Sequence, residues 1–321
     1  MFQFLQTIKT EGGGAAALVT AAHHFAHRND PEKLHELPGK GLQKGDNGDD
    51  PMLIVRDLHV KFNNRDHEAV AGVSFQIEDG EILGLVGESG SGKSVTAMSI
   101  AGLLPRKQCT YRGDILVDGH DMIHADRKFL RMAQGRRIGV VFQEPMSAMD
   151  PLMRIGEQVG EVLRIHTDMD AETRKAEVLR ALRDVELPDP EKVYEKYPHE
   201  LSGGMLQRAM IAAAIVIRPG LLLLDEPTTA LDVTIQVQIL ELLKKLNEEY
   251  GITMLFISHN LRVVRRLCKR VIVMKKGTIV EEGNTEEVFR NPQHPYTQHL
   301  IECIPTRETR AEGGRYDSGK Q

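Results

Sequence analysis

The segment at residues 87–94 reads GESGSGKS and matches the pattern GxxxxGK[ST]. It follows a short apolar run, residues 81–86, that is typical of a buried strand, and it precedes residues 95–104, which can continue as a helix. Its glycines let the backbone curl with N–H groups pointing inward, and the start of a helix adds partial positive charge. A glycine-rich turn could match by chance, but the flanking strand and helix favour a phosphate-binding loop in an α/β fold.

Each polar residue type in this phosphate-binding loop (residues 87–94) has a chemical task. The Lys93 ammonium can reach the β- and γ-phosphates of a nucleotide, and the Ser94 hydroxyl can hold Mg²⁺. The ring of Phe62, where an earlier β-rich segment ends, could stack on an adenine, although a lone aromatic is more often a core or edge residue. The predicted nucleotide-binding residues are Phe62, Gly87, Glu88, Ser89, Gly90, Ser91, Gly92, Lys93, Ser94 and Val95.

Composition narrows the class of protein. With 321 residues, of which 41% are hydrophobic, the chain can bury one large core or two modest ones. A formal net charge of -5 gives no general positive field, so nucleic acid is not an expected partner. Cys109, Cys268 and Cys303 show no CxxC spacing, which disfavours a disulfide framework or a zinc site and suits a reducing cytosol. No apolar run approaches the roughly 18 to 20 residues of a membrane helix, so we expect membrane association only through a partner.

The residue composition of the chain changes near residue 51, which predicts a domain boundary there. Residues 1–50 combine an Ala/Gly run, several histidines and a polar, glycine-dotted stretch, which predicts a flexible extension, with a metal-binding histidine cluster as the alternative. Residues 51–305 are predicted to form the folded domain, with a helical subdomain at about residues 144–218. Residues 306–321 are predicted to be a polar C-terminal tail.

Two kinds of secondary-structure pattern occur inside the domain. Residues 53–62 and 69–77 are β-rich and separated by a polar turn, as in an antiparallel hairpin or meander. Residues 155–187 carry apolar residues at helical spacing. Later strands and helices alternate, which is typical of a parallel sheet with helices on its faces. The further predicted elements are strands 114–118, 138–142, 221–225, 253–257 and 271–274, and helices 127–134, 233–250 and 261–268.

Two adjacent carboxylates follow a run of four leucines. Asp225 and Glu226 stand where this apolar strand meets Pro227, at the crevice edge where open α/β sheets bind ligands. Asp225 can orient Mg²⁺ through a water, and Glu226 can polarise the water that attacks a γ-phosphorus. A solvated surface turn is the alternative interpretation. The four leucines that precede the carboxylates disfavour it, because such an apolar run is typical of a buried strand.

The signature segment (residues 201–205) reads LSGGM and forms a second predicted anion cup. A serine and two glycines at the start of a helix present free N–H groups to an anion. A chain that already has a phosphate-binding loop does not need a second anion site for its own nucleotide. We therefore expect the second site to serve another molecule.

The order of these motifs resembles that of the nucleotide-binding subunits of ABC transporters. The resemblance spans about residues 52–305 and includes the phosphate-binding loop, Gln143, the signature segment, the LLLLDE run, Ala230-Leu-Asp232 and His259. It implies an α/β, ABC-type P-loop NTPase fold with a mixed sheet core, an antiparallel β subdomain and a helical signature subdomain. It also implies ATP hydrolysis with Mg²⁺ in a head-to-tail dimer, where each of two ATP molecules lies between one subunit's phosphate-binding loop and the other's signature segment.

The resemblance further implies roles for single residues. By the family pattern, Phe62 stacks on adenine, Gln143 senses Mg²⁺ and the membrane subunit, Glu226 is the catalytic base, Asp232 lies at the dimer interface and His259 contacts the γ-phosphate. The predicted catalytic residues are thus Glu226, His259 and Gln143, and the predicted metal-binding residues are Ser94, Gln143 and Asp225. The predicted residues for the partner's ATP are Leu201, Ser202, Gly203, Gly204 and Met205.

Finer features resemble the oligopeptide, dipeptide and nickel importers. They are Ser89 and Ser91 in the loop, FQEPM at 142–146, LSGGMLQR at 201–208 and HPYT at 294–297. Met205 resembles the D-type subunit of this branch, which pairs with a different, F-type ATPase. The expected partners are this second ATPase, two integral membrane permease subunits and, indirectly, an extracellular substrate-binding protein, with the chain peripheral at the cytoplasmic face of the cell membrane. Only Cys303 lies near the region where some members hold an iron–sulfur cluster, so no cluster is expected.

Other functions remain as alternatives. Peptides are the first choice of substrate, and nickel or a metal chelate is the second. A non-transport ABC ATPase is also considered: one for DNA repair or chromosome structure would need a long coiled coil, for which residues 95–200 are too few and lack heptads. A translation-factor ATPase usually carries two cassettes, whereas one phosphate-binding loop occurs here. A kinase-like phosphotransferase would leave the signature segment unexplained.

Overall fold

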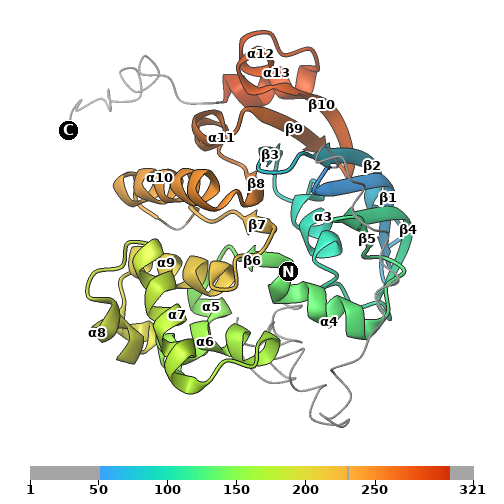
Figure 1. Ribbon diagram of the computed structural model, residues 1–321. Helices are drawn as coiled ribbons and strands as arrows, with labels where there is room; N and C mark the ends of the chain where they lie inside the picture. Colours follow the sequence, from blue (N-terminus) through green and yellow to red (C-terminus); the bar gives the residue numbers. More distant parts are fainter. Residues whose placement is uncertain (1–50, 230, 304–321) are drawn as a thin grey trace, which may run out of the picture.

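The computed structural model describes residues 51–229 and 231–303 (Figure 1). The predicted N-terminal extension and C-terminal tail, and Ala230, lie outside the described residues. In the described part of the chain, no helix is both long enough and apolar enough to cross a membrane.

A small antiparallel sheet has the strand order β2-β1-β4-β5. Strand β1 pairs antiparallel with β2 and with β4, which confirms the predicted hairpin or meander. The side chains of β1 alternate on each side of an irregularity between Val55 and Leu58. Leu53 and Val55 before it, and Leu58 and Val60 after it, are therefore all buried. The strands are β1 (Leu53–Phe62), β2 (Glu68–Ile77), β4 (Cys109–Val117) and β5 (His120–Asp121).

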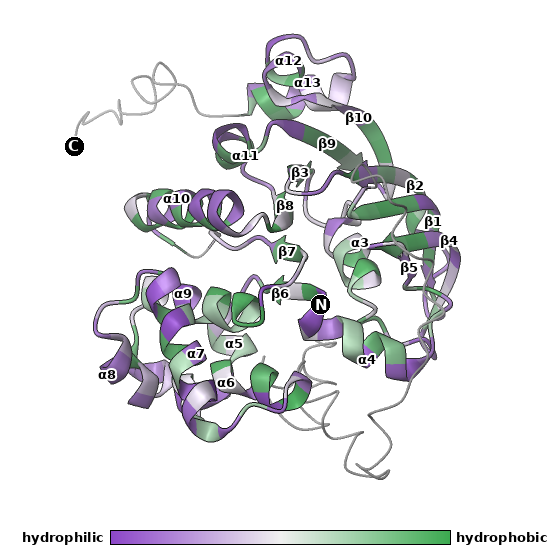
Figure 2. Cartoon of the chain, viewed as in Figure 1, coloured by the Kyte–Doolittle hydropathy of each residue, from purple (hydrophilic) through white to green (hydrophobic). Residues whose placement is uncertain are grey.

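A larger, mixed sheet has the order β10-β9-β3-β8-β7-β6. Strands β6, β7, β8, β3 and β9 are parallel, and β10 pairs antiparallel with β9. The central strands are buried along their whole length and appear hydrophobic in Figure 2, as expected when helices cover both faces. The strands are β3 (Ile82–Val86), β6 (Ile138–Val141), β7 (Leu221–Asp225), β8 (Thr253–Ser258), β9 (Arg270–Lys275) and β10 (Thr278–Asn284).

The register of the parallel strands decides where the loops meet. Val86 at the end of β3 pairs with Ser258 of β8, and Asp225 of β7 pairs with Ile257. The carboxyl ends of neighbouring parallel strands therefore lie at one edge of the sheet. This edge carries the phosphate-binding loop and the residues that follow β6, β7 and β8.

Apolar cores lie on both faces of the larger sheet. Leu83 and Leu85 of β3 face a core shared with α3 and the small sheet, whereas Ile82 and Val86 face a core shared with α6, α9, α10 and α11. Helices α5 to α9 gather beside β6, away from the small sheet (Figure 1). The helices are α3 (Lys93–Ile100), α4 (Arg127–Arg136), α5 (Pro145–Ala148), α6 (Ile155–His166), α7 (Ala171–Asp184), α8 (Pro190–Glu195), α9 (Gly203–Ile215), α10 (Val233–Tyr250), α11 (Leu261–Leu267), α12 (Thr285–Arg290) and α13 (Pro295–Glu302), with a 3₁₀ turn at Pro198–Glu200.

The structure corrects some predicted boundaries. The helix after the phosphate-binding loop spans Lys93–Ile100 instead of residues 95–104, because Gly102 adopts a left-handed φ of 64° that ends the helix. Strand β4 begins at Cys109, five residues earlier than predicted. Strand β10 was not predicted, since it is a half-exposed edge strand without a clean apolar alternation. The bounds of the helical subdomain stay a prediction.

Candidate nucleotide-binding site

The phosphate-binding loop connects β3 to α3, and its glycines are sterically required. Gly87 and Gly92 have φ values of 149° and 105°. A Cβ at Gly87 would lie 2.2 Å from the Met274 carbonyl oxygen, and one at Gly92 would lie 2.7 Å from the Ala69 carbonyl oxygen. Because both neighbours are backbone atoms, the loop cannot make room for a larger residue.

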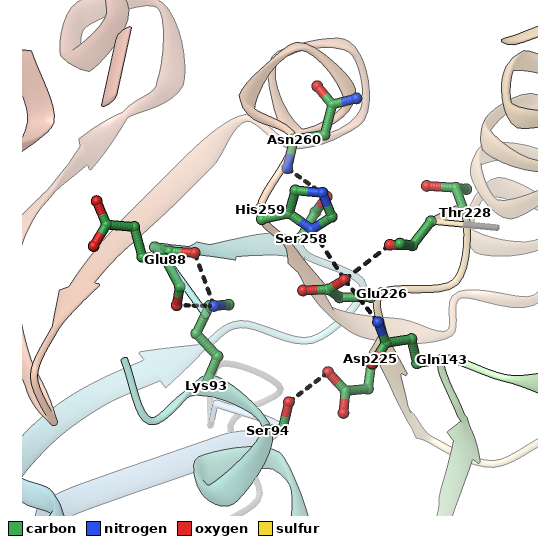
Figure 3. A network of polar contacts seen from close by, with 12 residues as sticks. Glu88, Lys93, Ser94, Gln143, Asp225, Glu226, Thr228, Ser258, His259 and Asn260 are labelled. Atoms are coloured by element: carbon green, nitrogen blue, oxygen red, sulfur yellow. Dashed lines mark hydrogen bonds and ion pairs between the residues drawn. The ribbon is translucent and has the colours of Figure 1, made fainter. Parts of the chain in front are cut away.

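Lys93 lies at the start of α3 and folds back over the loop. Its Nζ donates to the carbonyl oxygens of Gly87 and Glu88, each at 2.8 Å (Figure 3). It also donates to the Ser91 hydroxyl at 3.3 Å. The side chain is buried. Burial lowers the pKa of Lys93, and the negative charges of Glu226 and Asp225 act in the opposite direction.

Ser94 and Asp225 connect the loop to β7. The Ser94 hydroxyl donates to Oδ1 of Asp225 at 2.9 Å, across 131 positions of sequence. Asp225 is 2% exposed. Burial raises the pKa of Asp225 to about 6, although the Ser94 hydrogen bond favours the charged form. The pair forms an oxygen-rich position beside the loop, the ligand type that Mg²⁺ prefers.

Glu226 is turned away from Asp225 by its backbone. Its φ of 50° is left-handed, and its N–H donates to the Ile257 carbonyl oxygen at 3.0 Å. A non-glycine residue in this region carries strain of order 1 kcal/mol or more and often marks a functional site. The two adjacent carboxylates thus point to different partners.

Three donors meet on one oxygen of Glu226. Its Oε2 accepts from the Gln143 amide at 3.2 Å and from the Thr229 hydroxyl at 2.8 Å, and it lies 2.9 Å from Nδ1 of His259 (Figure 3). These residues follow β6, β7 and β8, so the sheet edge brings three loops together. Gln143 and His259 were predicted site residues, whereas Thr229 was missed; its position three residues after the carboxylate was the available signal.

Phe62 and Asp232 both have local contacts of their own, apart from the roles predicted for them in adenine stacking and at a dimer interface. Phe62 ends β1, is half-buried, and has the Arg65 guanidinium 5.5 Å from its ring centroid. Asp232 caps α10, since its Oδ1 accepts from the N–H groups of Thr234 and Ile235 at 3.0 Å. Adenine stacking and the dimer interface stay predictions for these two residues.

The signature segment starts α9, as predicted. The Ser202 hydroxyl accepts from the Met205 N–H at 3.4 Å and caps the helix, while Ser202 and Gly203 are exposed. Helix α9 lies within the helical group, apart from α3 (Figure 1). The structure therefore does not bring the two anion cups of one chain together around one site.

Comparison with known proteins gives the family. A model described as "ABC transporter" matches residues 70–229. The oligopeptide transport ATP-binding protein OppD of Bacillus subtilis is 45% identical over 264 residues, which cover 81% of this chain and 74% of that protein. The chain belongs to the family of ABC transporter ATP-binding proteins.

Further matches refine this assignment. The peptidoglycan transport ATP-binding protein YejF of Agrobacterium fabrum is 50% identical over 261 residues, 80% of this chain but 48% of that protein, so the chain spans about half of that relative. A model described as "Oligopeptide/dipeptide transporter, C-terminal region" matches residues 280–321. The predicted resemblance is thereby confirmed.

Solved ABC structures confirm the predicted fold class. The ATP-binding cassette MJ0796 in a dimeric post-hydrolysis state bound to ADP and Pi has a TM-score of 0.66 and 31% identity, covering 73% of this ABC protein and 99% of that chain. The cbiO1 protein from Clostridium perfringens has a TM-score of 0.65 and 30% identity, covering 79% and 99%. As a family member, the chain is an ATP-binding ATPase coupled to transport.

Proposed function

We propose that this ABC protein is the ATP-hydrolysing subunit of a membrane importer for di- or oligopeptides. The observation that carries the proposal is the cluster on Glu226, where donors from three loops hold one carboxylate beside a phosphate-binding loop. Such a group can act as a general base on water, whereas a simple nucleotide-binding module has no need of it.

The residues around the phosphate-binding loop divide the chemistry. Lys93 reaches the β- and γ-phosphates of ATP, and the loop N–H groups hold the remaining charge. Ser94, Asp225 and Gln143 provide oxygen ligands for Mg²⁺, and the 2.9 Å contact between Ser94 and Asp225 fits that task. When bound, Mg²⁺ neutralises charge on the phosphate oxygens.

Glu226 acts on the attacking water. Since the bonds from Gln143, Thr229 and His259 all fall on Oε2, Oε1 is the oxygen that takes up the water proton. The three donors fix the orientation of the carboxylate before the reaction, so no free energy of reorganisation is needed in the transition state. His259 is half-exposed and uses Nδ1 toward Glu226, so Nε2 is the ring nitrogen that contacts the γ-phosphate.

A second ATPase subunit completes the site. The exposed signature segment of this chain supplies N–H groups to the ATP of its partner, and the partner's signature segment closes over Lys93. The γ-phosphate joins the two subunits, so ATP binding closes the pair and hydrolysis opens it. The segment after Gln143 passes this motion to two permease subunits at the cytoplasmic face of the membrane, which receive substrate from an extracellular binding protein.

Peptide is the substrate class that the relatives favour. OppD is named for oligopeptide transport, and the model that matches residues 280–321 is described as the C-terminal region of oligopeptide and dipeptide transporters. Nickel or a metal chelate is not favoured by these names.

The test is co-purification of the tagged full chain from its native membranes, followed by hydrolysis assays. We expect two integral membrane subunits and a second ATPase in the complex, and ATP hydrolysis that rises with a peptide-loaded binding protein. A chain that purifies without membrane subunits, or a complex stimulated by nickel but not by peptide, would contradict the proposal.

A further inference from the structure

The C-terminal segment that begins with HPYT lies against the phosphate-binding loop. Tyr296, on the first turn of α13, accepts a hydrogen bond on its hydroxyl from the Glu88 N–H at 2.9 Å, across 208 positions of sequence. Neither the motif chemistry nor the site around Glu226 accounts for this contact. It joins the region that matches the oligopeptide and dipeptide transporter model to the residues that hold phosphate.

Tyr296 is itself held rigidly. The side chain is 6% exposed, and the Lys275 ammonium lies 4.6 Å from its ring centroid. Nδ1 of His294 accepts from the Tyr296 N–H at 3.0 Å and caps the helix. The hydroxyl therefore has a fixed position against which the loop can be aligned.

The chain before α13 is anchored to the sheet. The N–H groups of Gln293 and His294 donate to the two oxygens of Glu281 on β10, at 2.7 and 3.0 Å. Burial raises the pKa of Glu281, but the hydrogen bonds from the N–H groups of Gln293 and His294 act in the opposite direction, and the net pKa is lowered. A charged Glu281 thus fixes the start of α13 on the larger sheet.

The Tyr296 contact falls on the peptide unit that also serves Lys93. The N–H of Glu88 and the carbonyl of Gly87 belong to one planar peptide. The N–H side bonds to Tyr296, and the carbonyl side accepts from Lys93 Nζ at 2.8 Å. Because Gly87 has no side chain, this peptide could otherwise rotate at little steric cost.

A second contact supports the other end of the loop. The N–H of Gly277, in the turn between β9 and β10, donates to the Ser91 carbonyl oxygen at 2.9 Å. The loop is therefore fastened to the C-terminal part of the chain at two places, at residue 88 and at residue 91. Only the first of these uses a side chain, so only that one can be removed without changing the backbone.

We propose that Tyr296 is a positioning residue that sets the orientation of the Gly87–Glu88 peptide and, through it, the position of Lys93 for the phosphates of ATP. This role rests on the proposed function of the loop as an ATP site. In this role, the ring of Tyr296 packs α13 against the rest of the domain, and its hydroxyl orients the phosphate-binding loop.

The test compares Tyr296→Phe with wild-type protein in two measurements: the Kd for MgATP by isothermal titration calorimetry of the full chain, and KM and kcat by ATP hydrolysis in the assembled transporter. Removing the hydroxyl keeps the ring and its contact with Lys275. We expect the Kd and the KM for ATP to rise about three- to tenfold, the effect of losing one hydrogen bond, while kcat changes by less than about twofold. The midpoint of thermal unfolding without nucleotide should stay within about 2 °C, since little packing is lost.

Tyr250→Phe is the matched control. Tyr250, at the end of α10, also has a cation near its ring, Arg218 at 4.9 Å, and its hydroxyl is influenced by the Asp184 carboxylate, and both of these neighbours lie outside the phosphate-binding loop. Its variant should bind MgATP like the wild type. A Tyr296→Phe affinity within about 1.5-fold of wild type, or an equal loss in Tyr250→Phe, would overturn the positioning role. If the wild-type chain bound no MgATP, the proposed function would fail together with this inference.

Discussion

The two glycine-bearing helix starts of this protein look alike in sequence but differ in how they are built. The phosphate-binding loop uses left-handed glycines whose missing Cβ atoms leave room for backbone oxygens of β9 and β2. At the signature segment, neither Gly203 nor Gly204 has a left-handed φ, and a Cβ at either would approach a side chain instead of backbone, Leu231 at 4.0 Å and Ile235 at 2.8 Å. The phosphate-binding loop is therefore packed against backbone inside the fold, whereas the start of the signature segment lies at the surface.

Under the proposed function, this difference indicates which half of a shared ATP site the chain builds from its own residues. The loop already has its lysine, its serine and a supporting carboxylate in contact. In the signature segment, the Ser202 hydroxyl caps its own helix, and Ser202 and Gly203 are exposed. We therefore expect changes in the loop to alter nucleotide binding by the isolated chain, and changes in the signature segment to alter only its pairing with another subunit.

The largest effect is expected for Lys93→Ala. Loss of the buried ammonium leaves the triphosphate without its main counter-charge, so MgATP binding should fall by at least about 100-fold and become undetectable by calorimetry. Lys192→Ala, at an exposed ion pair on α8, is the control and should bind normally. An affinity of Lys93→Ala for MgATP within tenfold of wild type would contradict this prediction, because the phosphate-binding loop would then not be the main site for the triphosphate.

Glu226→Gln should be the next largest. The amide keeps the shape of the side chain but cannot take up a proton, so hydrolysis by the assembled transporter should fall roughly 10²- to 10⁴-fold while MgATP still binds. The closed pair of subunits should then accumulate in MgATP, as measured by size-exclusion chromatography with light scattering. Glu286→Gln, which removes an exposed carboxylate on α12, is the control. Unchanged turnover in Glu226→Gln would remove Glu226 from the role of base.

Ser202→Asp tests the second cup without damaging its helix. Asp is as good a helix cap as Ser, but its charge would repel a phosphate across the interface. The isolated chain should bind MgATP normally, whereas ATP-dependent association with the partner ATPase should weaken at least about tenfold, as measured by analytical ultracentrifugation. Ser202→Asn, which caps the helix without charge, should lose much less. Weaker MgATP binding by the Ser202→Asp chain alone would mean that this cup serves its own nucleotide.

The smallest effect concerns the pH dependence of stability. The folded-state pKa of Asp225 is about 6, above its ordinary value of 3.8, so the folded protein holds a proton that the unfolded chain loses first. Stability should therefore fall as pH rises through this interval. Relative to Asp225→Asn, wild-type protein without nucleotide should lose about 1 kcal/mol of unfolding free energy between pH 5 and 7.5. Urea unfolding at both pH values measures this, and parallel curves for the two proteins would show that burial does not penalise the charged form.

Much of the site was predictable because its chemistry is local in sequence. The glycine spacing predicts the loop, and the leucine run before Asp225 predicts a buried strand whose end reaches the ligand edge. The signature segment carries its own cap, so its helix start was also predictable. Thr229 was missed because its local signal, a position three residues after a carboxylate, is common in sequences, and the fold is needed to show its hydrogen bond.

The sequence by itself determined which residue types could bind phosphate and where helices begin, since these depend on neighbours a few positions apart. Only the tertiary structure decided which loops meet. The strand order places β6, β7 and β8 side by side, so that Gln143, Glu226 and His259 share one edge. It also places β3 beside β9, near the C-terminal segment from which Tyr296 reaches Glu88. Contacts across 33 to 208 positions depend on sheet register and packing, which no local pattern specifies.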